Sequence, residues 1–266
     1  VALIRWIAQI SDIGRVGHTI DRVEAATSKA LTSLQEHPLF DCWPLDGEPA
    51  GAAISSVKLG YVQHFDAKLL QRLADEHDLR ISVTARPGAY VSASRPLMWI
   101  EGQIGDDLVA ELIDAFVVGD QRSFDNDPRF GLVVLGEIAD KALSPSLNDP
   151  GTAIDVIGTV TRILCNLQPE TRPESVKNDR VAVVPLDPKD LLEDAFRPIA
   201  RDGAGLIEVA LRLLHSLEII ARLKPHLRQA ALDTARDAAG RAQHALGAEN
   251  DLKALKEAAA FAVSGR

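Results

Sequence analysis

The spacing of the apolar residues changes twice along this chain, and these changes constrain its fold more than any other feature. Over the first 35 residues, apolar side chains recur at steps of three and four, which is typical of a helix. Between residues 52 and 101, short runs with partial alternation of apolar and polar residues are typical of strands. Helical spacing returns after Gly105. The sequence therefore predicts an α+β fold, in which a small β-rich module (52–101) packs on a mainly helical remainder with a long N-terminal helix.

The same pattern divides the chain into three consecutive segments. We expect a helix at residues 1–36, a β-rich module at 50–104 and a helical domain at 105–266. Within the last segment, the apolar run at 181–184 is a short strand that could join the β-rich module. Among individual elements, we expect strand character over 53–62 and helices at 67–77, 106–118, 129–143, 151–167 and 187–199.

The beginning of the chain bears on a possible membrane connection. The first helix begins with Trp6 beside Arg5, which suits either a coiled coil or the continuation of a membrane helix. The single methionine is Met98, so we expect further chain upstream of Val1. No uncharged apolar stretch approaches the roughly 18–20 residues that a spanning helix needs, so we expect this part to be soluble.

Composition excludes several classes of function. Because 38 acidic residues outnumber 29 basic ones, giving a net charge of −9, we expect no broad binding of nucleic acid. The two cysteines, Cys42 and Cys165, cannot form a disulfide framework or a thiolate metal cage. We expect Cys165 to be a core residue. Cys42 has no basic neighbour to activate it as a nucleophile.

Acidic and histidine side chains give weak indications of a site. His64 and Asp66 lie two residues apart at a strand end, where a helix cap is a better interpretation of Asp66 than a metal ligand. Glu137 and Asp140 lie on one helix face and could bind a cation or act as acid and base. More often such carboxylates are solvated or form salt bridges, here to an arginine such as Arg122. The sequence identifies no metal site and no cofactor.

Two polar connections contain strong signals for helix starts. Asp127 before Pro128 is expected to cap the helix that follows it. The connector from Ser144 to Pro150 is rich in hydrogen-bonding groups, and Asp149 before Pro150 is again typical of a helix start. We therefore interpret this connector as a capped helix junction in preference to a catalytic loop.

Five stretches of the sequence share one resemblance: Gly60–Gln63 with Asp66, Arg86–Val91, Asp120–Arg122, Phe130–Gly131 and Ser144–Ala153. Together they resemble domain-of-unknown-function family 2254, a family of predicted bacterial membrane proteins. The run Ser144–Ala153 is the most specific of them, and the matches span about residues 1–160. The resemblance implies membrane-spanning helices before this region, with residues 1–34 leaving the last span, but it implies no reaction.

Two hypotheses follow. The first is a regulatory or assembly domain of a multi-span bacterial inner-membrane protein, of channel, transporter or sensor type, which faces the cytoplasm and forms homo-oligomers. Its contacts are expected in residues 1–34 and in the C-terminal helices. The second is an enzyme or a receptor for a small anion or a metal; whether the chain is an enzyme stays open. Its site would be built from Gln63, Asp66, Arg86, Arg122, Asn148 and Asp149, with the arginines binding an anionic ligand.

Overall fold

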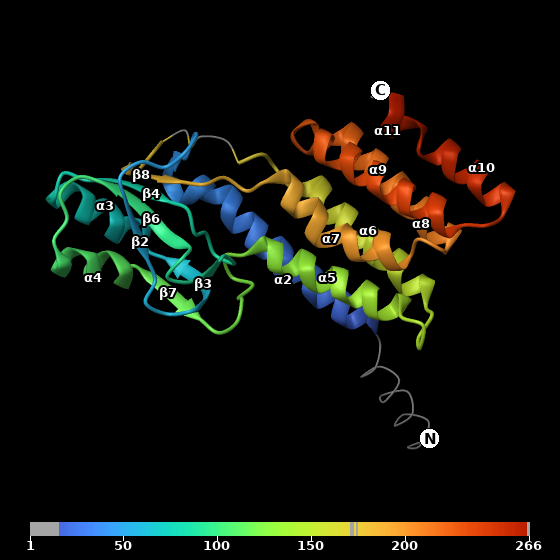
Figure 1. The fold of residues 1–266 in the computed structure, drawn as a ribbon, viewed down its shortest axis with the longest axis horizontal. Coiled ribbons are helices and arrows are strands. Elements are labelled where there is room, and N and C mark those ends of the chain that lie inside the picture. Colours follow the sequence, from blue (N-terminus) through green and yellow to red (C-terminus); the bar gives the residue numbers. More distant parts are fainter. Residues whose placement is uncertain (1–15, 171–172, 174, 265–266) are drawn as a thin grey trace, which may run out of the picture. The chain divides into compact units, whose positions relative to one another are not determined.

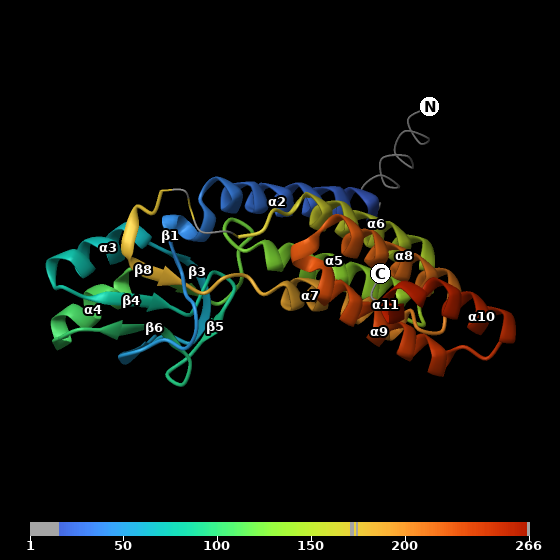
Figure 2. The same cartoon turned by 90° about the horizontal axis from the view of Figure 1, so that it is seen from above.

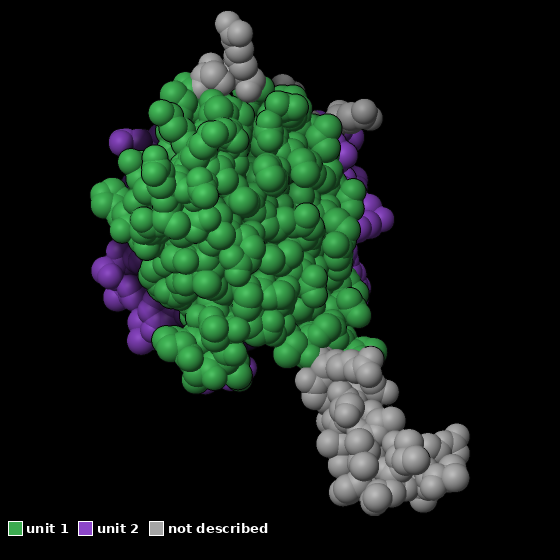
Figure 3. Space-filling model, turned by 90° about the vertical axis from the view of Figure 1, so that its right-hand side faces the viewer, with its two compact units in different colours: residues 1–26, 131–167, 188–266 green, residues 27–130, 168–187 purple. Residues whose placement is uncertain are grey.

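The chain forms two units, each assembled from non-consecutive segments. The computed structural model describes residues 16–170, 173 and 175–264. Unit 1 comprises residues 1–26, 131–167 and 188–266, and unit 2 comprises residues 27–130 and 168–187 (Figure 3). By contrast, the apolar pattern of the sequence predicts consecutive segments. Helices and strands both contribute substantially, so the expected α+β class is confirmed.

Unit 2 contains every strand that the structure describes (Figure 1). The strands are β1 (Cys42–Pro44), β2 (Ala52–Ser55), β3 (Gly60–Phe65), β4 (Arg80–Val83), β5 (Tyr90–Val91), β6 (Pro96–Glu101), β7 (Phe116–Gly119) and β8 (Asn178–Val183). One sheet has the order β1-β8-β4-β6-β2, in which β8 is parallel to both neighbours and the other pairs are antiparallel. The other sheet has the order β5-β3-β7 and is antiparallel. The strand expected near 181–184 is confirmed as β8 (Figure 2).

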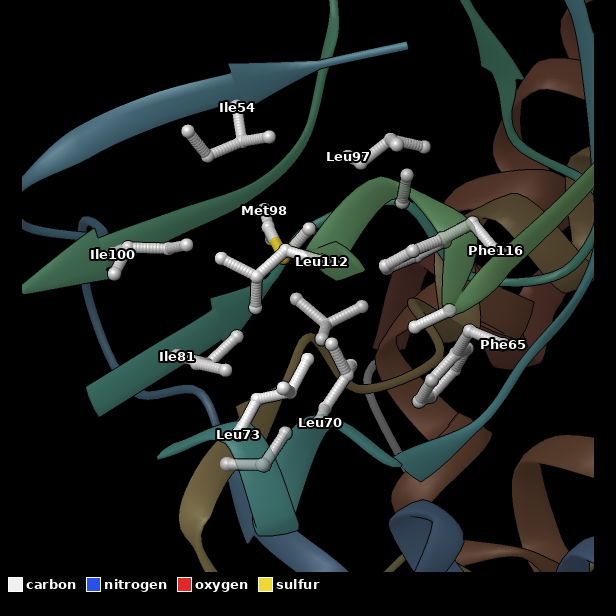
Figure 4. Packing of buried hydrophobic residues seen from close by; sticks show 14 of the residues in the cluster. Ile54, Phe65, Leu70, Leu73, Ile81, Leu97, Met98, Ile100, Leu112 and Phe116 are labelled. Atoms are coloured by element: carbon white, nitrogen blue, oxygen red, sulfur yellow. The ribbon is translucent and has the colours of Figure 1, made fainter. Parts of the chain in front are cut away.

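The core of unit 2 lies between its strands and two helices, α3 (Ala67–Glu76) and α4 (Asp106–Asp114). Leu70 of α3 and Leu112 of α4 are fully buried beside the strand residues Ile81 and Met98 (Figure 4). The rings of Phe65 and Phe116 stack with their centroids 5.6 Å apart. Burial of such side chains supplies the main driving force for folding of the unit.

The structure divides one expected element of unit 2 and shortens another. The strand character at 53–62 belongs to two strands, because the backbone N–H of Lys58 donates to the Ser56 hydroxyl in a turn between β2 and β3. The helix expected at 106–118 ends with α4 at Asp114. The β-branched Val117 and Val118 continue as β7, which pairs with the distant strand β3.

A left-handed turn leads into β1. Within the short element η1 (Pro38–Asp41), the three consecutive residues Leu39, Phe40 and Asp41 have φ angles of 53°, 58° and 60°. None of them is glycine, so each residue is in a costly conformation. Two hydrogen bonds hold the turn. Asn178 Nδ2 donates to the carbonyl oxygen of Phe40 at 3.0 Å, and the Lys177 N–H donates to that of Asp41 at 3.1 Å.

Unit 1 is helical throughout its described elements. It contains residues of α2 (Val16–Glu36) and α5 (Pro128–Leu143), together with α6 (Pro150–Asn166), α7 (Pro188–Asp202), α8 (Ile207–Leu223), η2 (Pro225–Leu227), α9 (Arg228–Ala245), α10 (Glu249–Ala258) and α11 (Ala260–Ser264). The long N-terminal helix is confirmed from Val16 onwards, and residues 1–15 of the expected helix lie outside the described residues. The helices expected at 129–143, 151–167 and 187–199 correspond to α5, α6 and α7.

Small side chains let the last helices of unit 1 approach closely. The alanines of α9 at 231, 235, 238 and 242 are buried where α9 packs against α7 and α8 (Figure 1). One face of α6 is likewise apolar and buried against α8. Among the helices that the structure describes, none has the length and apolar character to cross a bilayer.

Candidate functional site

Arg86, a candidate anion-binding residue, is buried in unit 2 and bound to a carboxylate of the same unit. Its Nη1 and Nη2 atoms each donate to one oxygen of Glu170, both at 2.7 Å. Nη1 also donates to the carbonyl oxygen of Val184 at 2.9 Å. The guanidinium carbon lies 5.5 Å from the centre of the Phe40 ring. A paired carboxylate, a carbonyl and a ring therefore surround this guanidinium, which is the usual arrangement of a structural arginine.

Arg122 is likewise bound to a carboxylate of its own unit. Its Nε and Nη2 atoms donate to the two oxygens of Asp127 at 2.7 and 2.9 Å, and its guanidinium lies 5.4 Å from the centre of the Phe130 ring. The same Asp127 carboxylate accepts the backbone N–H of Phe130 at 3.2 Å. Asp127 therefore caps the first turn of α5, as the sequence predicts, and fixes Arg122 with the same group.

Two glycines leave the space that the side chains of Asp127 and Gln63 occupy. Gly88 has a φ of +91°, and a Cβ at this position would collide with the carboxylate of Asp127. A Cβ at Gly119 would lie 2.5 Å from Nε2 of Gln63, whose side chain crosses this glycine to donate to the carbonyl oxygen of Gln121 at 2.8 Å. Gln63 and the Arg122–Asp127 pair thus each occupy space that a glycine leaves free. Steric fit and hydrogen bonding account for these residues without a ligand.

The remaining candidate residues shape helix starts. Asp66 caps α3, because its Oδ1 accepts the backbone N–H groups of Lys68 and Leu69, both at 3.0 Å. Asp149 caps α6 in unit 1, where it accepts the N–H of Thr152 at 3.2 Å and its hydroxyl at 2.6 Å. The hydroxyl bond is the main reason that the pKa of Asp149 lies below its usual value. Asn148 precedes this cap with a φ of +46°, a conformation that asparagine tolerates better than most residues.

The sequence candidates therefore divide between the units. Gln63, Asp66, Arg86 and Arg122 lie in unit 2, whereas Asn148 and Asp149 lie in unit 1. Within unit 2, Gln63 reaches the residue that precedes Arg122. The junction at 144–150 contains the two features of a capped connector, a left-handed residue and an N-cap aspartate.

Asp140 of α5 has an arginine partner, but not the one suggested by the sequence. Arg201 of α7 donates to Asp140 at 2.8 Å and to its neighbour Asp202 at 2.7 Å. A hydrogen bond with Asp202 raises the pKa of Asp140, and the hydrogen bond from Arg201 helps to lower that of Asp202 to about 2. The salt-bridge interpretation thus describes Asp140, with Arg201 in place of Arg122. Among the described residues, no group of three His, Cys, Asp or Glu side chains could hold a metal.

Sequence reasoning missed the partners that come from distant segments. Glu170 lies 84 residues after Arg86, and no local pattern connects the two. A second group, His37, Asp41 and Lys177, lines a pocket of unit 2 together with the candidate Asp66. His37 and Asp41 have a helical i,i+4 spacing that could have suggested a pair, but Lys177 reaches Asp41 from 136 residues away.

This chain belongs to the family described as "Predicted membrane protein (DUF2254)". The family's sequence pattern matches residues 1–219, most of the chain. The family resemblance inferred from the sequence motifs is therefore confirmed. The match also extends beyond the motifs, which span about residues 1–160.

The chain is also similar to uncharacterized proteins of Mycobacterium bovis and Mycobacterium tuberculosis. Each is 32% identical over 143 residues, which cover 52% of this chain and 27% of the relative. The matched part thus spans about a quarter of the length of these relatives. No solved structure matches the chain.

Proposed function

We propose that this chain is a non-catalytic regulatory or assembly region of a larger, multi-span bacterial inner-membrane protein. In this proposal it faces the cytoplasm and associates with further copies of itself. Membership of a family of predicted membrane proteins supports the setting. The observation that carries the non-catalytic part is the commitment of Arg86 and Arg122 to carboxylates of their own unit. Guanidinium groups whose charge is already balanced by a carboxylate hold a fold together and are poor candidates for binding a passing substrate.

Exposed apolar side chains of the C-terminal helices support self-association. Ile219 and Leu223 lie one turn apart on α8 and are 45% and 63% exposed, and Val263 of α11 is also exposed. Clustered apolar groups on a surface are a common feature of protein interfaces. The C-terminal helices were also the expected contact region, so they are the first place to test.

Light scattering coupled to gel filtration tests the association directly. We expect the 266-residue chain, and the full-length protein in detergent, to form a discrete oligomer over a wide range of concentration. Leu223→Asp should weaken association at least tenfold, because it puts a charge into the proposed contact. Val57→Asp is the matched control, since Val57 is equally apolar and 86% exposed but lies in unit 2. Strictly monomeric behaviour of both chain and full-length protein would refute the proposal.

Thiol labelling of the full-length protein tests the cytoplasmic orientation. Ser146 is exposed in the connector between α5 and α6, Cys42 is buried, and Cys165 can be replaced by serine to remove background. A membrane-impermeant maleimide should modify Ser146→Cys in inside-out vesicles and leave it unmodified in intact spheroplasts. Labelling in spheroplasts would place this region on the opposite side.

The second hypothesis is a ligand site built on Asp66, Arg86, Arg122 and Asp149, and it requires these arginines to be available to a ligand. An anion that took the place of the present carboxylate partner of Arg86 or Arg122 would have to break the hydrogen bonds of Glu170 or Asp127. Measuring how much the Glu170 pair contributes to stability, as described below, therefore also separates the two hypotheses.

A further inference from the structure

A pocket of about 690 Å³ in unit 2 brings together three segments that are distant in sequence. η1 contributes Phe40 and Asp41, and the junction between β3 and α3 contributes His64 and Lys68. Lys177 comes from the residues just before β8. Phe40 and Phe65 are among its apolar lining residues, and Asp41, Lys68 and Lys177 are among its charged ones. A concave site with an apolar wall and a few convergent polar groups is the usual form of a small-molecule site.

Both carboxylates in this pocket are occupied. Oδ2 of Asp41 lies 2.9 Å from Nζ of Lys177 and 3.2 Å from Nδ1 of His37. Partial burial raises the pKa of Asp41, but the bonds and charges of Lys177 and His37 outweigh this and lower it, so Asp41 stays ionised. Asp66 uses its Oδ1 atom to cap α3. Asp41 is therefore committed to its ion pair, and Asp66 uses one of its two oxygens as a helix cap.

The groups that remain free are hydrogen-bond donors. The side chains of His64, Lys68 and Asn126 make no hydrogen bond or ion pair within the part of the chain that the structure describes. The ammonium of Lys177 has three N–H groups, of which Asp41 uses one. The unused hydrogen-bond donors of the pocket thus include two lysine ammonium groups, an amide and an imidazole. These groups approach from different segments, which suits an anion with several oxygens better than a flat carboxylate.

We propose that this pocket binds a phosphate monoester. Lys68 and Lys177 supply the positive charge for the phosphoryl oxygens, as lysine commonly does in phosphate sites. His64 and Asn126 donate further hydrogen bonds, and the organic part of the ligand lies along Phe40. The volume of the pocket leaves room for such a group beside the phosphate. This site uses residues other than Arg86 and Arg122, and it does not depend on self-association of the chain.

Calorimetric titration of the 266-residue chain tests the proposal with two probes, a soluble one and a lipid, that each contain a phosphate monoester. Glycerol 3-phosphate is the soluble probe, and phosphatidylcholine vesicles with or without phosphatidic acid present a lipid phosphate monoester. We expect one equivalent of ligand to bind. Lys68→Ala should weaken binding about tenfold, the loss expected for one charge-assisted hydrogen bond. Lys58→Ala is the matched control, because Lys58 is an exposed lysine of the same unit that does not line the pocket.

The results of these titrations distinguish a soluble ligand from a lipid headgroup and can also overturn the proposal. Binding of glycerol 3-phosphate that Lys68→Ala weakens and Lys58→Ala preserves supports a soluble ligand. Binding confined to the phosphatidic acid vesicles, with the same dependence on Lys68, assigns the site to a lipid headgroup. Absence of binding to both probes, or an equal loss in the Lys58 and Lys68 variants, overturns the proposal. His64→Gln, at a second exposed position of the pocket, should also weaken binding. The test therefore does not depend on the folding of a single variant.

Discussion

Replacing Glu170 by glutamine tests whether the buried ion pair of unit 2 stabilises the fold. Both side chains of the pair are 9% exposed, and the carboxylate also accepts the backbone N–H of Leu186 at 2.8 Å. Glu170→Gln keeps the shape of the side chain but leaves the Arg86 guanidinium charged and away from water without a counterion. Removing one partner of a buried pair in this way costs about 3–5 kcal/mol.

Urea denaturation followed by tryptophan fluorescence measures this loss. Trp43 and Trp99 both lie in unit 2, and a Trp6→Phe background removes the third tryptophan, so the signal reports on this unit. With a denaturant dependence of about 2 kcal/mol per molar urea, a loss of about 4 kcal/mol lowers the unfolding midpoint by about 2 M. The double variant Arg86→Met with Glu170→Met removes both charges and should recover most of the stability.

A matched control shows which result would refute this reasoning. Glu76→Gln removes the same charge from an exposed pair with Arg72, 3.7 Å apart, where the expected loss is below about 1 kcal/mol. If Glu170→Gln shifts the midpoint no more than Glu76→Gln does, Arg86 does not depend on its carboxylate. Arg86 would then be available to an anionic ligand, and the second functional hypothesis would gain support.

Three further results are expected. Gly88→Ala should lower the urea midpoint of unit 2 more than Gly47→Ala, because both glycines have positive φ but only a Cβ at 88 meets the Asp127 carboxylate; equal shifts would show that backbone strain alone matters. Asp149→Ala should cost about 1 kcal/mol near neutral pH, measured by thermal unfolding. Since the folded pKa of Asp149 is lowered, its contribution is present above the unfolded value of about 4 and disappears as the pH falls through the folded value, so the variant and parent should converge in acid. Burial raises the pKa of Cys42 to about 12, so mass spectrometry should find this thiol unmodified by maleimide at pH 8 until urea unfolds unit 2, and rapid labelling of the folded chain would contradict the structure.

Local signals in the sequence predicted the helix starts well. Asp66, Asp127 and Asp149 were each expected as caps, and each accepts a backbone N–H two or three residues further along. Such signals succeed because the cap and the group it satisfies lie within one turn. The helical spacing of the second half of the chain was predictable for the same reason.

Features that depend on distant segments could not be predicted. The stretch 106–118 has helical spacing throughout, yet Val117 and Val118 form β7 because β3, about 55 residues earlier, offers a partner; the pairing joins Val62 to Val118. Arg86 was a candidate for binding an anion because its carboxylate partner, Glu170, lies in a connection 84 residues away. Gln63 and Arg86 were thus candidates whose partners, 58 and 84 residues away, a single sequence does not reveal.

The left-handed turn at 39–41 has a consequence for the order in which the chain acquires its structure. Three non-glycine residues in this conformation cost roughly 1–2 kcal/mol each. The bonds that offset this cost come from Asn178 and Lys177, on a stretch of chain synthesised some 138 residues after Phe40. A nascent chain on the ribosome can form local bonds, such as that from the Phe40 N–H to the carbonyl oxygen of His37, but it lacks the bonds from Asn178 and Lys177 until that later stretch has emerged. We expect the antiparallel pairing of β4 with β6 to form first, and the parallel edge strand at Cys42 to be among the last parts of the sheet to order.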